Sequence, residues 1–199
     1  MSVHNFPVSP EPYRAVLADP PWPMKDQGTR MSPAYRGSQR RELHYCIMSL
    51  ADIMNLPIID LVAKDSLLFL WRLASTQEEA LRVVKAWGFT VKSEIVWCKI
   101  QKPDPSFLSG IDWPRPRIGG GHYVRNAHET CLVCARGRAA SLIQNHSVPS
   151  WFLVPRGRHS AKPEEFYGMI ERLVAGPYLE LFARNKREGW DSWGDQLDA

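Results

Sequence analysis

The feature that most constrains the fold is the alternation of short apolar runs with segments of helical periodicity. The apolar runs have the length of β-strands and occupy residues 13–18, 66–73, 89–100, 129–136 and 178–184. Helical patterns cover residues 49–64, which Pro57 divides into two short helices, and residues 75–88 and 159–174. Strands that alternate with helices are typical of an α/β fold, so we predict a mainly parallel central sheet flanked by helices.

Local signals predict where these helices begin and end. Ser49 is the expected N-cap of the first helix. Ser75 and Glu78 have the spacing of a capping box, and Gly88 is expected to end the same helix. The helix at 159–174 is expected to bury an apolar stripe of Phe166, Tyr167, Ile170 and Val174.

Length and composition predict one soluble domain. The chain has 199 residues, 44% of them hydrophobic and 23% charged, so we expect residues 1–199 to form a single domain with a substantial core. No apolar run reaches membrane-spanning length, and residues 1–14 lack the regions of a signal peptide. We therefore expect a cytoplasmic protein that makes no membrane contact. Polar stretches at about 22–46 and 101–127 predict two long loops, which in a compact domain are usually functional or mobile.

The cysteines raise the question of a metal site. Cys131 and Cys134 have C-x-x-C spacing, which is a zinc-binding pattern when a second pair accompanies it. Here the pair falls within a predicted strand, where side chains three residues apart point to opposite faces, and there is no second pair. We therefore expect no metal site.

The basic residues leave two interpretations open. The net charge is +4, and arginine outnumbers lysine by 17 to 8 among the 25 basic residues. Many of these arginines lie in loop-like segments that also contain Trp113, Tyr123 and Trp151. Arginine suits phosphate, and aromatic rings can stack on bases. A solvated surface with ordinarily packed aromatics explains the same residues equally well.

The tetrapeptide Asp19-Pro20-Pro21-Trp22 directly follows the first predicted strand. Ligands of an open parallel sheet bind at the carboxyl ends of its strands, so this strand would deliver Asp19 to the binding edge. The prolines fix the backbone and remove two N–H donors, which leaves carbonyl oxygens to accept hydrogen bonds. A carboxylate, a rigid carbonyl and an aromatic plane together suit a planar aromatic amine. A strand-ending turn with a capping aspartate is the alternative that these four residues alone leave open.

The motif and its surroundings resemble the MT-A70 family of adenine-N6 methyltransferases, whose catalytic signature is Asp-Pro-Pro-Trp. Blocks similar to those of the family follow in the family's order as "HYCIMSLADIMNLPI", "LLFLWR", "AWGF", "EIVWCK", "GHYVRNAHETCLV", "HSAKPEEFYGMIERL" and "LELFAR…GW…WGDQLD". The resemblance covers residues 16–197 and implies a Rossmann-like class I methyltransferase. In that arrangement the catalytic motif precedes the main cofactor-binding segment, and S-adenosyl-L-methionine is the methyl donor.

The resemblance also implies roles for individual residues. Asp19 and the Pro20 backbone would hold the target amino group, Trp22 would line the base pocket, and Lys162 would lie near the cofactor's carboxylate. The residues expected to bind the cofactor are Ala18, Asp19, Lys162, Glu180, Leu181, Phe182, Arg184, Asn185, Asp195 and Gln196. The residues expected to border the substrate are Tyr35, Tyr123, Arg125, Asn126, His128 and Glu129.

The function that the resemblance implies is methylation of the N6 amino group of adenine in a nucleic acid. DNA is the expected substrate, because the chain is short and contains no recognisable RNA-binding module. RNA is the alternative, and a non-catalytic nucleic-acid-binding subunit with the same fold is a second. Neither the sequence nor the resemblance distinguishes a monomer from a homodimer.

Overall fold

A single mixed sheet organises the part of the chain that can be described. The structure is a computed structural model that describes residues 6–23, 48–102, 115–119, 123–157 and 162–197. Within these ranges, seven strands form one sheet in the order β5-β3-β4-β2-β1-β6-β7. The strands are β1 (Tyr13–Ala18), β2 (Val62–Arg72), β3 (Thr90–Ile100), β4 (His128–Arg136), β5 (Trp151–Pro155), β6 (Tyr178–Leu181) and β7 (Trp190–Trp193).

Strand direction determines which strand ends meet at each edge of the sheet. Strand β4 is antiparallel to both of its neighbours, β2 and β3. The pairs β1–β2, β1–β6, β6–β7 and β3–β5 are parallel. The prediction of a mainly parallel sheet is therefore confirmed. The start of β4 lies at the same edge as the carboxyl ends of β2 and β3.

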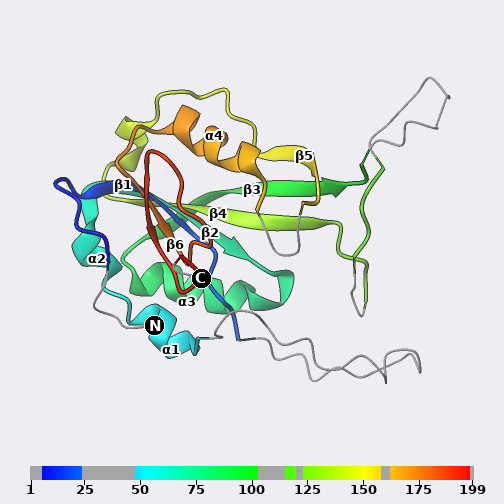
Figure 1. The fold of residues 1–199 in the computed structure, drawn as a ribbon, viewed down its shortest axis with the longest axis horizontal. Coiled ribbons are helices and arrows are strands. Elements are labelled where there is room, and N and C mark those ends of the chain that lie inside the picture. The colour runs from blue at the N-terminus through cyan, green and yellow to red at the C-terminus, as the bar shows by residue number, and fades with distance from the viewer. Residues whose placement is uncertain (1–5, 24–47, 103–114, 120–122, 158–161, 198–199) are drawn as a thin grey trace.

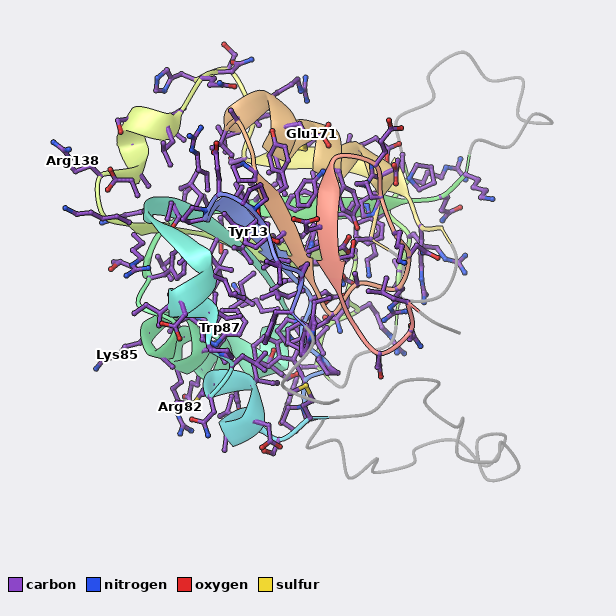
Figure 2. The ribbon with its side chains drawn as sticks, turned by 60° about the vertical axis from the view of Figure 1, so that its left-hand side comes forward. Tyr13, Arg82, Lys85, Trp87, Arg138 and Glu171 are labelled. Carbon is purple, nitrogen blue, oxygen red and sulfur yellow. The ribbon has the colours of Figure 1, made fainter. Side chains whose placement is uncertain are left out.

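Helices cover both faces of the sheet and form a core on each side (Figure 1). The helices α1 (Leu50–Met54), α2 (Ile58–Leu61) and α3 (Gln77–Ala86) contribute to one apolar cluster, and α4 (Glu164–Leu173) contributes to the other. Figure 2 shows Arg82 and Lys85 on α3 and Glu171 on α4, on opposite sides of the sheet. Cys131 and Cys134 belong to different clusters, which confirms that they face opposite sides. Among the described residues, no group of three metal-binding side chains occurs.

Helix ends agree with the sequence patterns in two of three cases. The Ser49 hydroxyl accepts a hydrogen bond from the Asp52 N–H, as expected of an N-cap. Gly88 ends the next helix with a φ of +77°. The predicted capping box of Ser75 and Glu78 is wrong. Thr76 Oγ1 instead accepts a hydrogen bond from the Leu73 N–H at 3.1 Å, which holds residues 74–76 in a 3₁₀ turn and delays the start of α3 until Gln77.

Several strand boundaries differ from the expectation. Strand β2 begins at Val62, four residues before the predicted start, and β5 and β7 were not predicted. Strand β6 ends at Leu181 instead of residue 184, because Phe182 adopts a φ of 62° that no strand accommodates. In the long segment 101–127, Pro116 forms an antiparallel bridge with Ile100, so the described part of this segment extends the sheet. Residues 24–46, most of the first predicted loop, lie outside the described ranges.

Candidate active site

Four chain segments bring charged side chains to one edge of the sheet. Asp19 follows β1 directly, and Lys99 is the penultimate residue of β3. Glu129 is the second residue of β4, which starts at this edge because it runs antiparallel to its neighbours. Lys162 lies two residues before α4. Because β4 runs antiparallel to β2 and β3, the Glu129 carboxylate lies near the Asp19 carboxylate at this edge of the sheet.

Lys162 connects the two carboxylates. Its Nζ lies 2.8 Å from Asp19 Oδ2 and 3.1 Å from Glu129 Oε2, and Lys99 forms an ion pair with Glu129 Oε1. Burial opposes the charged form of Lys162, but the negative charges of Asp19 and Glu129 outweigh it and raise the lysine's pKa. Burial likewise opposes ionisation of Glu129, but Lys162 and Lys99 lower its pKa overall. The cluster thus joins two basic side chains to two acidic ones.

Lys162 and Lys99 each lie over the ring of a buried tryptophan. Lys162 Nζ lies 5.2 Å from the centre of the Trp71 ring, and Lys99 Nζ lies 4.9 Å from that of Trp97. Both tryptophans are buried in the core on the α4 side of the sheet. The lysine side chains are 14% and 16% exposed, so water only partly screens their charges. These contacts hold the ammonium groups in place at the edge of the sheet.

The Asp-Pro-Pro-Trp motif is anchored at its far end. Trp22 is 6% exposed and packs in the core on the α3 side, where its Nε1–H donates a hydrogen bond to the Trp71 carbonyl at 3.1 Å. The Trp22 backbone N–H donates to the Pro20 carbonyl at 2.8 Å. A carbonyl oxygen has two lone pairs, so the Pro20 oxygen keeps one acceptor position. These contacts hold the Trp22 ring in place, and its expected role in lining a base pocket stays a prediction.

A pocket of about 430 Å³ opens beside Asp19. This volume falls within the range of small-molecule sites. Its wall contains six of the residues expected to bind the cofactor, namely Asp19, Lys162, Glu180, Phe182, Arg184 and Asn185. Ala18 and Leu181 are buried within their strands, and Asp195 and Gln196 follow β7 without lining this pocket.

Five residues of the wall were not expected from the sequence. They are Glu164, Tyr167, Lys186, Arg187 and Glu188. We predicted that Tyr167 belongs to the apolar stripe of the helix at 159–174. The tyrosine is partly buried and packs against the apolar cluster on the α4 side of the sheet. A tyrosine has an apolar ring and a polar hydroxyl. Its position in a helical pattern therefore does not show whether it packs in the core or faces a ligand.

Tyr167 and Glu180 form the polar floor of the pocket. The Tyr167 hydroxyl donates a hydrogen bond to Glu180 Oε1 at 2.8 Å. Burial raises the pKa of Glu180 to about 7, the tyrosine hydrogen bond opposes this rise, and the charge of Asp19 adds to it. Burial also raises the pKa of Tyr167, so its hydroxyl remains a donor at physiological pH. The carboxyl of Glu180 is thus close to half ionised near neutrality.

The loop between β6 and β7 closes one side of the pocket. The Arg187 guanidinium lies 3.9 Å from the centre of the Tyr167 ring and forms an ion pair with Glu164. The base of the loop is tight, because a Cβ on Gly194 would lie 2.1 Å from the Ala183 carbonyl oxygen. Only glycine fits there. The loop therefore contacts α4 through Arg187, and through Ala183 it packs closely against Gly194, which directly follows β7.

Of the residues expected to border the substrate that the structure describes, Glu129 joins the charged cluster. Tyr123, Arg125 and Asn126 are exposed on the chain leading into β4, and His128 is exposed at the first position of that strand. The Asn126 carbonyl accepts a hydrogen bond from the Gly119 N–H. Tyr35 lies outside the described residues. Lys99 was not predicted, because a lysine near the end of a strand carries no signal until its neighbour in the sheet is known. No helix in the described ranges combines the length and apolar character needed to span a bilayer.

Three proteins that are similar in sequence to this chain are named as methyltransferases. The chain is 30% identical to an N(6)-adenosine-methyltransferase MT-A70-like protein of Drosophila melanogaster, in an alignment that covers 94% of this chain and 27% of that protein. It is 29% identical to the N(6)-adenosine-methyltransferase catalytic subunit METTL3 of Homo sapiens, with coverages of 94% and 28%. It is 27% identical to the type II methyltransferase M.MunI of a Mycoplasma species, with coverages of 96% and 81%.

The chain thus spans about a quarter of the length of the N(6)-adenosine-methyltransferase relatives. Its mainly parallel sheet with helices on both faces agrees with a Rossmann-like methyltransferase fold. The sequence profile of the MT-A70 family matches residues 13–196, which include every strand and helix described above. The chain belongs to the MT-A70 family, as its motifs predicted.

Proposed function

We propose that this chain is an S-adenosylmethionine-dependent methyltransferase that acts on the N6 amino group of adenine in a nucleic acid. One observation carries the proposal. The Asp19 carboxylate stands at the carboxyl end of β1, borders a pocket of about 430 Å³ and is held by Lys162 at 2.8 Å. A carboxylate that is fixed between a small-molecule pocket and an open sheet edge can contact two reactants at once.

The lining of the pocket suits the cofactor. The Lys162 ammonium has three donors, and two of them bind Asp19 and Glu129, so the third is available for a ligand carboxylate. Glu180 can accept hydrogen bonds from ribose hydroxyls, and Phe182 offers an apolar surface to an aromatic ring. When bound, the cofactor supplies a methyl group activated on a sulfonium.

The residues of the motif would hold the amino group of the target base. Lys162 binds Oδ2 of Asp19, and Oδ1 of the same carboxylate can accept one N–H of the base. The Pro20 carbonyl, oriented by the Trp22 N–H, can accept the other. Two acceptors fixed in this way direct the nitrogen lone pair toward the methyl group. Catalysis then rests on positioning and on electrostatic complementarity.

The substrate would be a base presented outside a stacked duplex, either from a single strand or by extrusion. Exposed arginines at positions 115, 117 and 125 lie on the chain that extends the sheet beyond β3 and β4, where they can contact phosphates. DNA is the first substrate to test, because a type II methyltransferase is among the relatives. RNA is the alternative that the names of those relatives favour. We also propose that the protein is located in the cytoplasm.

The test is methyl transfer from radiolabelled S-adenosylmethionine to single- and double-stranded DNA and RNA oligonucleotides that contain adenine. We expect the wild-type protein to label at least one of them, and Asp19→Ala to abolish labelling while the cofactor still binds. Asp60→Ala is the matched control, since Asp60 is exposed on α2, away from the site, and should retain full activity. Cofactor binding without transfer to any oligonucleotide would instead support a non-catalytic subunit.

A further inference from the structure

Asp19, Glu129 and Glu164 each form an ion pair with a lysine or arginine, whereas the Glu180 carboxylate is held by a tyrosine hydroxyl. The Tyr167 hydroxyl donates a hydrogen bond to Glu180 Oε1 at 2.8 Å. The charge of Asp19 opposes the ionisation of Glu180. Partial burial raises the pKa of this carboxyl, and the hydrogen bond from the neutral tyrosine donor offsets only part of the rise.

The Tyr167 ring is itself held on two sides. Arg187 stacks on it with the guanidinium carbon 3.9 Å from the ring centre, and the Trp190 ring meets it edge to face at a centroid distance of 5.4 Å. These contacts leave the phenol little freedom to turn. The direction of its hydroxyl, and hence the orientation of the Glu180 carboxylate, is set by the packing of α4 against the loop between β6 and β7.

We propose that Tyr167 is a positioning residue of the cofactor pocket, and that its hydroxyl keeps Glu180 oriented and ionised to accept the cofactor's hydroxyl groups. The inference rests on the proposed function and adds a regulatory consequence to it. An ionised carboxylate accepts two hydroxyl hydrogen bonds, whereas a protonated one competes as a donor. Cofactor affinity should therefore rise with pH through neutrality.

Other titratable groups around Glu180 do not produce the same effect. The pocket wall also contains Asp19 from the end of β1, Lys162 and Glu164 from the start of α4, and the loop residues Arg184, Lys186, Arg187 and Glu188. Lysine and arginine keep their charge between about pH 6 and 9, and ordinary carboxylates are already ionised there. Burial raises the pKa of Glu180 to about 7, which places it inside this range.

The experiment measures the affinity for S-adenosylhomocysteine by calorimetry between about pH 6 and 9. This product analogue avoids turnover, and its own titration is the same for every variant. For the wild type we expect affinity to rise about tenfold across the range, with a midpoint near pH 7. In Tyr167→Phe the ring contacts remain and the donor is lost, so the midpoint should move upward by about one pH unit. The variant should bind about fivefold more weakly than wild type near pH 7 and almost equally near pH 9.

Two further variants keep the test decisive. Tyr178→Phe is the matched control, because that tyrosine also contacts the Trp190 ring but donates its hydroxyl hydrogen bond to the Val174 carbonyl and not to Glu180. It should leave the pH profile unchanged. Glu180→Gln should bind weakly and show no rise across the range, and this comparison holds even if Tyr167→Phe does not fold.

The outcomes separate this inference from the proposed function. A pH-independent affinity in the wild type, or an equal loss at every pH in Tyr167→Phe, would overturn the role of Tyr167 and leave the methyltransferase proposal standing. Absence of cofactor binding to the wild type at any pH would overturn the proposed function itself.

Discussion

Replacing Lys162 by methionine removes the charge that joins the two carboxylates of the site while keeping a side chain of similar length. The lysine forms ion pairs with Asp19 at 2.8 Å and with Glu129 at 3.1 Å. The three side chains are 14%, 28% and 21% exposed, so none is fully buried and none is at the open surface. Among the described residues, the substitution removes the ammonium partner of Asp19 and leaves Glu129 paired with Lys99.

The expected cost lies between two known limits. Breaking a fully buried ion pair costs about 3–5 kcal/mol, and an exposed pair contributes about 0–1 kcal/mol. Partial burial of two pairs predicts a loss of about 2–3 kcal/mol in the free energy of unfolding. For a chain of this length, that corresponds to a fall in Tm of about 5–10 °C.

The loss should depend on pH in a direction that the pKa shifts determine. The pKa of Glu129 is lowered in the folded state, so its contribution is present above the unfolded value of 4.5 and is lost as the pH falls through the folded value. The pKa of Lys162 is raised, so its contribution is complete below 10.5 and is lost as the pH rises through the folded value. The full penalty is therefore expected between about pH 5 and 10.

Thermal unfolding followed by circular dichroism measures the effect, at about pH 7 and about pH 3. Lys92→Met is the matched control, since Lys92 is exposed on β3 and should change Tm by less than about 1–2 °C. An unchanged Tm at neutral pH in Lys162→Met, or a loss of the same size at both pH values, would refute the reasoning.

Two other substitutions test the architecture around the pocket. Gly194→Ala should lower the free energy of unfolding by about 1–3 kcal/mol in urea, because its Cβ would lie 2.1 Å from the Ala183 carbonyl oxygen. Gly168→Ala, in a helical position with open space around its Cβ, should instead raise it by about 0.5–1 kcal/mol, and equal effects at the two sites would contradict this account. Trp22→Phe leaves the buried Trp71 carbonyl without its 3.1 Å donor and should cost about 1–3 kcal/mol. Because Trp22 anchors the motif, methyl transfer should fall further than cofactor affinity, and an equal fall in both would contradict the anchoring role.

Much of the site could be predicted because it depends on signals local in sequence. The apolar run at 13–18 identified a buried strand, and the tetrapeptide after it placed Asp19 at a strand end, as the structure shows. The resemblance to the family then added Lys162 and Glu180, and both border the same pocket. Because Asp19 directly follows a strand and precedes two prolines, its place at the carboxyl end of that strand could be predicted from the sequence.

The rest depends on pairings between segments that are distant in sequence. Lys99 meets Glu129 only because β4 runs antiparallel to β3, and no pattern in either strand indicates that direction. The motif gives no sign that the Trp22 indole N–H donates to the Trp71 carbonyl, because that residue lies 49 positions away in the chain. Tyr167 has the spacing of a core residue, and only the fold shows its hydroxyl at Glu180.

The central claim is that the Asp19 site transfers a methyl group to the N6 nitrogen of adenine. The most direct measurement is nucleoside mass spectrometry after incubation of adenine-containing DNA and RNA with S-adenosylmethionine that carries a deuterated methyl group. The account predicts N6-methyladenine that carries the deuterated methyl group with the wild-type protein and none with Asp19→Ala. A deuterated methyl group on another atom, or an undiminished yield from Asp19→Ala, would contradict it.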